Sequence, residues 1–426
     1  MAVAAPPQSQ AASLEEQRRW EGSIEQLRGL VSDRAVSGDT MLLNMGPHHP
    51  STHGVLRLLL ELDGEQIVTC LPDIGFLHTG IEKSIEDKTY EKAVPLTDRM
   101  DYLSPMSNNM AYAAAVEKLL DLDVPERAQI IRVVCLELAR CASHLVWLGT
   151  HAIDMGAMSV LLYAFRERER ILGMFEMLSG QRMMSSYIRP GGVWRDVPAD
   201  FLPTLKQFLN DFPYKVDDYE ALLTQNPIWK DRSQGVGVVE PDVALAYGMT
   251  GPALRGSGVN WDLRKAQPYS GYETYEFNVP LGDHGDVYDR YLIRIHEFRE
   301  SLKILQQAVS RLERTQGPTR SENRKYCPPL RSELGQSMEA VIHHFKLWTY
   351  GYDAPDDEIY CAIESPRGEI GCYIHGAGTN KPRRVHFKTP SFMHISALPV
   401  VSKGYLLADM VAIIGSVDIV LGDCDR

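Results

Sequence analysis

Two histidines, His49 and His53, stand four residues apart in the segment Gly46-Pro-His-His-Pro-Ser-Thr-His-Gly54. On a helix this spacing would place both imidazoles on one face, as in a metal-binding pair. The prolines at positions 47 and 50 prevent a regular helix, and no glutamate completes an HExxH motif. We therefore expect a loop, and histidines on a loop held by a rigid scaffold are well placed to meet a ligand. On these residues alone, histidines bonded within the protein remain the default interpretation.

A cation, a carboxylate and a phenol occur together in Arg99-Met-Asp-Tyr102. A tyrosine hydroxyl can donate a proton when a partner tunes it, although a buried one commonly bonds a backbone carbonyl. Further along the chain, Asp154 follows His144 and His151 in an apolar helical stretch. Because aspartate is seldom buried unpaired, we expect it to have a partner, either a histidine or a nearby arginine.

Other segments exclude common enzyme sites. Glu364-Ser-Pro-Arg-Gly-Glu369 is typical of a tight turn between two strands. The glycines at 235–237 and 251–258 do not form GxGxxG between a strand and a helix, which disfavours a Rossmann nucleotide site. The sequence also has no P-loop and no GxSxG nucleophile elbow.

Composition excludes further classes. The 426 residues carry a net charge of −12, so the chain has no electrostatic footprint for nucleic acid. The longest apolar stretch, 141–165, is interrupted by Asp154 and is not a bilayer span. Seven scattered cysteines without a CxxC pair argue against a disulfide scaffold, a zinc ribbon and a cysteine-held iron–sulfur cluster. Since the N-terminus resembles neither a signal nor a transit peptide, we expect a cytoplasmic bacterial setting.

The elements that must position these residues indicate an α+β fold, mainly helical, with β segments near both ends. We predict an N-terminal tail and amphipathic segment over 1–40, and one domain over 41–426. The parts expected within this domain are a β hairpin at 54–72, a helical core at 80–315 and a C-terminal α+β part at 332–426. Individual elements are predicted as helices at 199–211, 286–314 and 406–414, strands at 358–374 and 384–388, and a solvated, salt-bridged helix face at 165–170.

Taken together, several segments resemble one family. They are Gly46-Pro-His-His-Pro-Ser-Thr-His-Gly54, Arg99-Met-Asp-Tyr102, Arg189-Pro-Gly-Gly192, Gly256-Ser-Gly258, Glu364-Ser-Pro-Arg-Gly368 and Gly422-Asp-Cys-Asp-Arg426. From Met41 to the last residue, the chain resembles the family of 49 kDa-type (D-type) subunits of NADH–quinone oxidoreductase, respiratory complex I. The resemblance implies the fold of the nickel–iron hydrogenase large subunit. It also implies one wall of a quinone pocket, completed by a small subunit that carries the terminal four-iron–four-sulfur cluster.

The resemblance also implies roles for single residues. His53 and Tyr102 correspond to the two residues that bond the quinone headgroup, Asp154 to the carboxylate that pairs with the histidine, and Arg99 to an arginine near the cluster. Reducing a quinone to a quinol takes two electrons and two protons. An imidazole with a pKa of about 6.5 and a phenol with a pKa of about 10 both hold a proton at neutral pH. A carboxylate beside the imidazole would orient it and favour its protonated form.

The sequence departs from the family at two positions. Met184 stands where many relatives carry a histidine near the cluster, and Thr79 stands where some carry an arginine. A proton-coupled shift of the cluster potential through that histidine is therefore not expected, and the arginine contact to the cluster is lost or supplied elsewhere.

Two rival functions fit the sequence less well. A nickel–iron hydrogenase needs four thiolates, but the matching positions hold Asp101, Ser104, Val420 and Asp423, so we expect no metal or flavin on this chain. A pure scaffold would not need His53, Tyr102 and Asp154 together.

The implied partners are the cluster-bearing small subunit, a C-type peripheral subunit, the membrane subunit at the quinone entrance and the quinone itself. The implied location is peripheral, on the cytoplasmic face of the bacterial membrane. These motifs leave open whether the quinone is ubiquinone or menaquinone, and how proton pumping is coupled.

Overall fold

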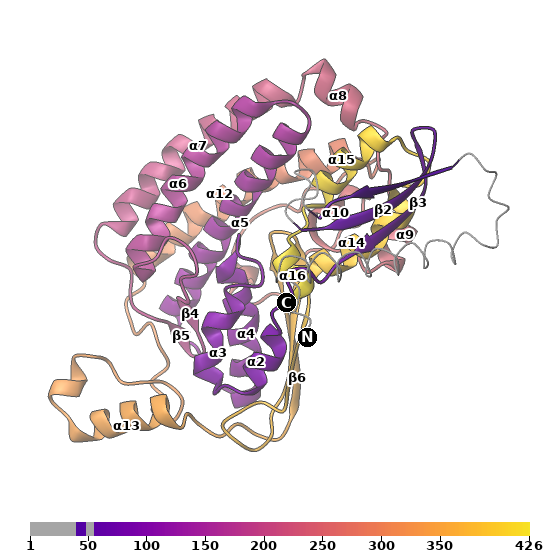
Figure 1. Cartoon of the computed structure of the whole chain (residues 1–426). Coiled ribbons are helices and arrows are strands. Elements are labelled where there is room, and N and C mark those ends of the chain that lie inside the picture. The colour runs from indigo at the N-terminus through magenta and orange to yellow at the C-terminus, as the bar shows by residue number, and fades with distance from the viewer. Residues whose placement is uncertain (1–39, 48–54) are drawn as a thin grey trace, which may run out of the picture.

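The computed structural model describes residues 40–47 and 55–426 (Figure 1). Helices make up most of it. Three-stranded antiparallel sheets lie toward the two ends of the chain and a two-stranded sheet lies at residues 188–193, which confirms the α+β class. The predicted tail over 1–40, apart from its last residue, and His49 and His53 lie outside the described residues. No helix in the described ranges is long and apolar enough to cross a membrane.

Long helices packed side by side form the larger body of the molecule (Figure 1). They are α4 (Pro105–Leu120), α5 (Glu126–Asp154), α6 (Met158–Ser179), α7 (Phe201–Leu223) and α12 (Val287–Arg314). Helix α5 is the central one, and it packs on both α6 and α12. Apolar residues recur along it with helical spacing, and nearly all of its side chains are buried. The end of α5, with Asp154 as its last residue, is therefore held rigidly.

Two predictions for these helices were incomplete. Helix α7 runs to Leu223 rather than ending at 211, because the apolar stripe continues through Val216 and Tyr219 despite Pro213 inside the helix. In the 165–170 segment, Glu167 accepts from the guanidinium groups of two neighbouring arginines, as a salt-bridged face requires. Glu167 is nevertheless only 2% exposed, so this face, which was predicted to be solvated, is partly buried.

A three-stranded antiparallel sheet in the order β1-β2-β3 forms the second body. Its strands are β1 (Met41–Met45), β2 (Arg57–Asp63) and β3 (Gln66–Asp73). The predicted hairpin is β2 with β3, turning at Gly64, whose φ of 62° suits glycine. Strand β1 was not predicted. Its partners on β2 lie beyond the 46–54 segment, so the pairing is not a local signal. The sheet packs with α14 (Pro390–Val401) and α15 (Leu407–Val417) over a shared apolar core.

A third sheet extends from the lower part of the molecule in Figure 1. It contains β6 (Glu358–Ser365), β7 (Gly368–His375) and β8 (Arg384–Lys388), close to the predicted strands, and α4 packs on it. The remaining elements are α2 (Ile81–Glu86), α3 (Tyr90–Thr97), β4 (Ile188–Arg189), β5 (Gly192–Val193), α8 (Pro227–Ser233), α9 (Pro241–Ala246), α10 (Gly251–Gly256), α11 (Leu263–Ala266), η2 (Tyr272–Thr274), η3 (Glu333–Gly335), α13 (Met338–Thr349) and α16 (Leu421–Asp425). Helix α16 lies between the two bodies, and α13 stands apart from both (Figure 1).

Candidate functional site

The C-terminal residues tie several distant segments together. The carboxylate of Asp425 accepts hydrogen bonds from the backbone N–H groups of Gly75 (2.8 Å) and Leu77 (2.7 Å). Its backbone carbonyl lies 2.7 Å from Nδ1 of His78. The guanidinium of Arg426 is 3.0 Å from a carboxylate oxygen of Glu82 on α2. The chain end is therefore fixed against the loop that follows β3.

Gly422 lies directly against the segment that carries Arg99 and Tyr102. A Cβ atom at Gly422 would lie 2.6 Å from the carbonyl oxygen of Met100 and 3.2 Å from Cε1 of Tyr102. Any side chain would clash with this backbone, so the close approach requires glycine. Two of the motifs singled out in the sequence are thus in contact, although they lie more than 300 residues apart.

An arginine from a third motif joins the same region. Arg367, in the turn between β6 and β7, donates a hydrogen bond of 2.6 Å to Asp101 and one of 3.2 Å to Asp418. Arg367 is fully buried. Oδ1 of Asp101 also accepts from the backbone N–H of Leu103 (3.1 Å), across Tyr102. This arrangement, which we call the Arg367 cluster (Asp101, Arg367, Asp418 and Asp423), fixes the backbone on both sides of Tyr102.

The electrostatics of the cluster follow from burial. Burial raises the pKa of Asp101, and the charge of Arg367 partly opposes this. Burial together with the charge of Asp101 raises the pKa of Asp423 to about 7. Burial also raises the pKa of Tyr102 above its usual value, so the phenol keeps its proton at neutral pH. The site thus offers a neutral hydroxyl donor beside carboxylates that a buried guanidinium holds in place.

The predicted site residues occupy different places around this cluster. The side chain of Tyr102 is partly exposed, and that of Arg99 is exposed and bonds the carbonyl of Pro95. Asp154 is partly exposed at the end of α5. His53 lies outside the described residues, so its pairing with Asp154 stays a prediction.

Helix α15 connects the end of α5 with the Arg367 cluster. Trp147 of α5 donates to the carbonyl of Gly415 at 2.6 Å, and the ring of His151 fills the space where a side chain at Gly415 would lie. Three residues after Gly415, Asp418 bonds Arg367. The segments that carry Asp154 and Tyr102 are therefore joined by one short helix.

Met184 and Thr79, the two departures from the family pattern, lie on segments that contact Asp98 and the C-terminal residues respectively. Asp98, at the end of α3, accepts hydrogen bonds from the backbone (3.1 Å) and hydroxyl (2.5 Å) of Ser186. Burial raises the pKa of Asp98 to about 6. Met184, two residues before Ser186, has a φ of 53°, an uncommon value outside glycine. Thr79 follows His78, which contacts the chain end.

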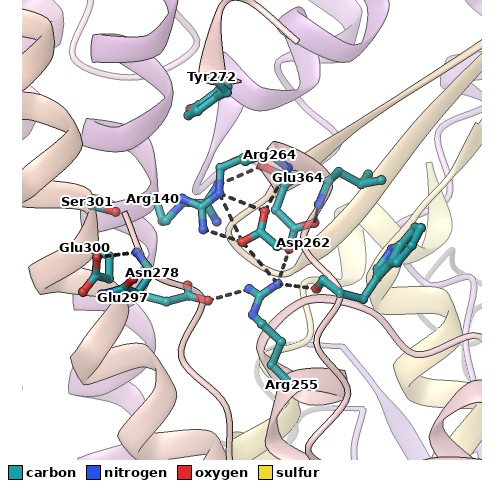
Figure 2. Close-up of polar contacts among 12 residues, drawn as sticks. Arg140, Arg255, Asp262, Arg264, Tyr272, Asn278, Glu297, Glu300, Ser301 and Glu364 are labelled. Atoms are coloured by element: carbon teal, nitrogen blue, oxygen red, sulfur yellow. Dashed lines mark hydrogen bonds and ion pairs between the residues drawn. The ribbon is translucent and has the colours of Figure 1, made fainter. Parts of the chain in front are cut away.

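A second group of buried charges supports the turn that carries Arg367 (Figure 2). Arg255 contacts Glu297 at 2.5 Å and Glu364 at 2.7 Å, and all three side chains are at most 1% exposed. Arg140 donates to the backbone carbonyls of Glu364 (2.8 Å) and Ser365 (3.1 Å). Arg140 and Arg255 therefore fix the end of β6, directly before the turn that carries Arg367.

The same network extends through the core of the helical body. Asp262 and Glu137 flank Arg264, at 2.7 and 3.2 Å. Glu297 also lies 2.7 Å from Nε2 of His144 on α5. Figure 2 shows Arg264, Glu297 and Glu364 of this network converging from helices and loops far apart in sequence. The sequence analysis missed this network. The available signal was that charged residues stand within otherwise apolar, periodic stretches, which indicates buried charges.

Sequence reasoning also missed the role of Arg367. The segment around it was correctly predicted to be a turn, but that interpretation said nothing of where the guanidinium points. The rival hydrogenase positions, Asp101 and Asp423, are indeed brought together, since the charge of one raises the pKa of the other. Their donor atoms are carboxylate oxygens, which do not match a site built from thiolates. Within the part of the chain that the structure describes, no group of three or more His, Cys, Asp or Glu could hold a metal ion.

Comparison with known proteins gives a consistent result. The family model for the 49 kDa subunit of respiratory-chain NADH dehydrogenase matches residues 154–426. A D-type subunit of NADH-quinone oxidoreductase from Chloroflexus aurantiacus is 59% identical, over 93% of this chain and 97% of its own length. The D-type subunit from Herpetosiphon aurantiacus is 62% identical over 91% and 92%, and that from Geotalea uraniireducens is 52% identical over 92% and 100%. This chain therefore belongs to the 49 kDa subunit family of respiratory-chain NADH dehydrogenase, that is, to the D-type subunits of NADH-quinone oxidoreductase.

Proposed function

We propose that this chain forms one wall of the quinone pocket in a proton-translocating NADH–quinone oxidoreductase, where quinone is reduced to quinol. The observation that carries the proposal is the setting of Tyr102. Its partly exposed phenol lies on a segment fixed by the buried Arg367–Asp101 pair and by Gly422. Such a rigid, neutral donor at the edge of a buried charged cluster suits a ligand carbonyl.

The residues of this chain would supply proton donors and orientation. The four-iron–four-sulfur cluster of the adjacent small subunit would supply two electrons, and with two protons the quinone would become quinol. The Tyr102 hydroxyl donates a hydrogen bond to one quinone oxygen, and its raised pKa keeps it protonated until transfer. His53 serves the other oxygen, with Asp154 orienting its imidazole. Arg99, whose side chain is exposed, would contact the cluster-bearing subunit.

The proposal also covers assembly and location. The chain works only within the complete complex, because its electrons come from another subunit. Its partners are the cluster-bearing small subunit, a C-type peripheral subunit and the membrane subunit at the quinone entrance. It lies peripherally on the cytoplasmic face of the cell membrane. Neither metal nor flavin is assigned to this chain, and quinone is its substrate.

Tyr102→Phe in the assembled complex tests the central claim. The ring and its packing remain while one donor is lost, which costs about 1–3 kcal/mol, or about tenfold to a hundredfold in quinone turnover or affinity. NADH oxidation with an artificial acceptor upstream of the quinone should stay normal. Tyr163→Phe on α6, where the ring is 45% exposed, is the matched control and should change neither rate. Unchanged quinone kinetics in an assembled Tyr102→Phe complex would show that Tyr102 is structural.

Photo-labelling separates the proposal from a scaffold role. A photoreactive quinone analogue bound to the assembled complex should label peptides of this chain near residues 99–104. Labelling wholly in other subunits would favour a chain that docks its neighbours without contacting substrate.

A further inference from the structure

A groove lined by arginines lies far from Tyr102 in the chain, beside the separate helix α13. It encloses about 1320 Å³ between residues 189–196, the loop at 317–334 and α13. Five arginines line it, and we call it the Arg groove. They are Arg189, Arg195, Arg320, Arg324 and Arg331. In Figure 1, α13 stands away from the helical body, with this loop leading into it.

The positive charge of the Arg groove is only partly neutralised. Three carboxylates also line it. Asp196 is paired at 2.9 Å with Arg127, which is not a groove residue, and Glu333 pairs with Arg324 and so neutralises one of the five arginines. This leaves Glu322 beside the other four. A further carboxyl, that of Glu91, lies close enough for Arg189 and Arg320 to lower its pKa. Burial outweighs their effect and raises that pKa to about 7, so Glu91 carries only part of a charge at neutral pH.

Three of the arginines are held in place by backbone carbonyls rather than by carboxylates. Arg195 donates to the carbonyls of Leu178 (2.7 Å) and Met177 (3.0 Å), and Arg320 donates to that of Val193 (2.9 Å). Arg189 donates to the carbonyl of Ser186 at 3.1 Å. Carbonyls orient a guanidinium without cancelling its charge. The groove is therefore a preorganised anion-binding surface on a chain whose net charge is −12.

An apolar surface lies next to the Arg groove. His344 and Trp348 of α13 line the groove. Four apolar side chains at helical spacing form a second stripe on α13, roughly a quarter turn around the helix axis from these two residues. These four are Met338, Val341, Ile342 and Phe345, which are 71%, 42%, 47% and 65% exposed. Trp194 adds a ring that stacks with Arg195, 5.1 Å from its centroid. Exposed apolar stripes of this kind mark contact surfaces.

We propose that the Arg groove and the outer face of α13 dock an acidic segment of another subunit of the same complex, one that also carries apolar side chains. Carboxylates pair with the uncompensated guanidinium groups, while the apolar side chains cover the stripe on α13. The net charge of −12 makes most of this chain unfavourable for an acidic segment. Electrostatics therefore favour binding of the segment at the Arg groove. The inference uses the chain's membership of a multisubunit oxidoreductase family and does not depend on the quinone assignment.

Site-specific cross-linking in the assembled complex tests this. A photoreactive benzoylphenylalanine replaces Leu330, a groove residue that is 58% exposed, and in a second variant Val341 on the α13 stripe. After irradiation, mass spectrometry should find both positions linked to one segment of another subunit in which Asp and Glu outnumber Lys and Arg. Links only within this chain, only to lipid, or to a segment without excess acid would overturn the proposal.

Charge reversal provides the matched comparison. Arg331→Glu removes a groove charge whose side chain forms no hydrogen bond or ion pair in the described part of the chain. Combined with Arg195→Glu, it should lower the cross-linking yield at position 330 by about tenfold or more. Arg383→Glu combined with Arg384→Glu makes the same total charge change at two sites that are 57% and 50% exposed, and it should leave the yield unchanged. Equal loss in both would show a general charge effect and contradict a specific groove. Quinone turnover by the complexes that assemble reports separately on the Tyr102 site.

Discussion

Arg367 and Asp101 lie 266 residues apart in sequence, and their side chains form a buried hydrogen-bonded ion pair of 2.6 Å. Arg367 extends this pair to Asp418, so one guanidinium connects the turn after β6, the segment before α4 and the residue after α15. Tyr102 directly follows Asp101. The position of the proposed quinone donor therefore depends on a contact between two distant parts of the chain.

Arg367→Gln should destabilise the protein and disturb the proposed quinone site together. Without the guanidinium, Asp101 and Asp418 are left as buried carboxylates without their cation, which costs about 3–5 kcal/mol. The assembled complex should show a lower thermal midpoint and slower quinone turnover, with Arg367→Lys restoring part of both. Arg384→Gln, half exposed and paired with Glu86, is the control and should cost at most about 1 kcal/mol. Equal losses for the two variants would show that the Arg367 cluster has no special role.

Gly422→Ala should displace the segment that carries Tyr102. The added methyl group would lie 2.6 Å from the carbonyl oxygen of Met100, so the backbone of one segment must move. We expect a quinone-turnover defect of about tenfold or more in assembled complex, since small displacements of a positioned group have effects of this size. Gly173→Ala, within α6 where a Cβ meets no atom within 4 Å, should be neutral or slightly stabilising. A Gly422→Ala complex with normal quinone kinetics would contradict the proposed positioning.

Asp423→Asn should change how stability depends on pH. The pKa of Asp423 in the folded protein is about 7, well above its value of about 3.9 in an unfolded chain. A raised carboxyl pKa favours folding at low pH, and this contribution is lost as the pH rises from about 4 to about 7. Asparagine does not ionise, so the Asp423→Asn variant does not undergo this loss of stability. The thermal midpoint of the variant relative to wild type should therefore rise across this window and level off above it.

The control for this pH dependence is Asp87→Asn. Asp87 is 76% exposed, and its hydrogen bond with Lys381 lowers its pKa, so its contribution to stability is small and of the opposite sign. A pH-independent difference for Asp423→Asn would mean that the pKa of Asp423 is the same in the folded and unfolded protein, and it would contradict the raised pKa.

Glu297→Gln should test the buried network of Figure 2. The carboxylate is shared by Arg255 at 2.5 Å and His144 at 2.7 Å, and its removal leaves a buried guanidinium short of negative charge. The expected cost is about 3–5 kcal/mol. Glu313→Gln, on the same helix α12 but 44% exposed and paired with Lys206, should cost at most about 1 kcal/mol. Chemical denaturation of the two variants, compared with wild type, measures the difference directly.

Local pattern explains which parts of the fold were predictable. The buried apolar period of α5 and α12, the alternation in β6 and β7, and the turn at Gly64 are signals carried by neighbouring residues, and each element formed where expected. Strand β1 and the second half of α7 were missed because pairing with β2 and packing of the apolar stripe outweighed the local cues. Helix α13 was missed although its apolar residues recur at helical spacing.

The sequence by itself determined the α+β class, the family and the residues that the family motifs single out, because motifs and periodicity are readable along the chain. The tertiary structure alone decided that Arg367, Asp101 and Asp418 meet, that Gly422 packs on the Tyr102 segment, and that five arginines surround one groove. The physical reason is that a buried charge takes its partner from whatever element packs against it. That choice depends on contacts across hundreds of residues, and no spacing along the chain encodes it.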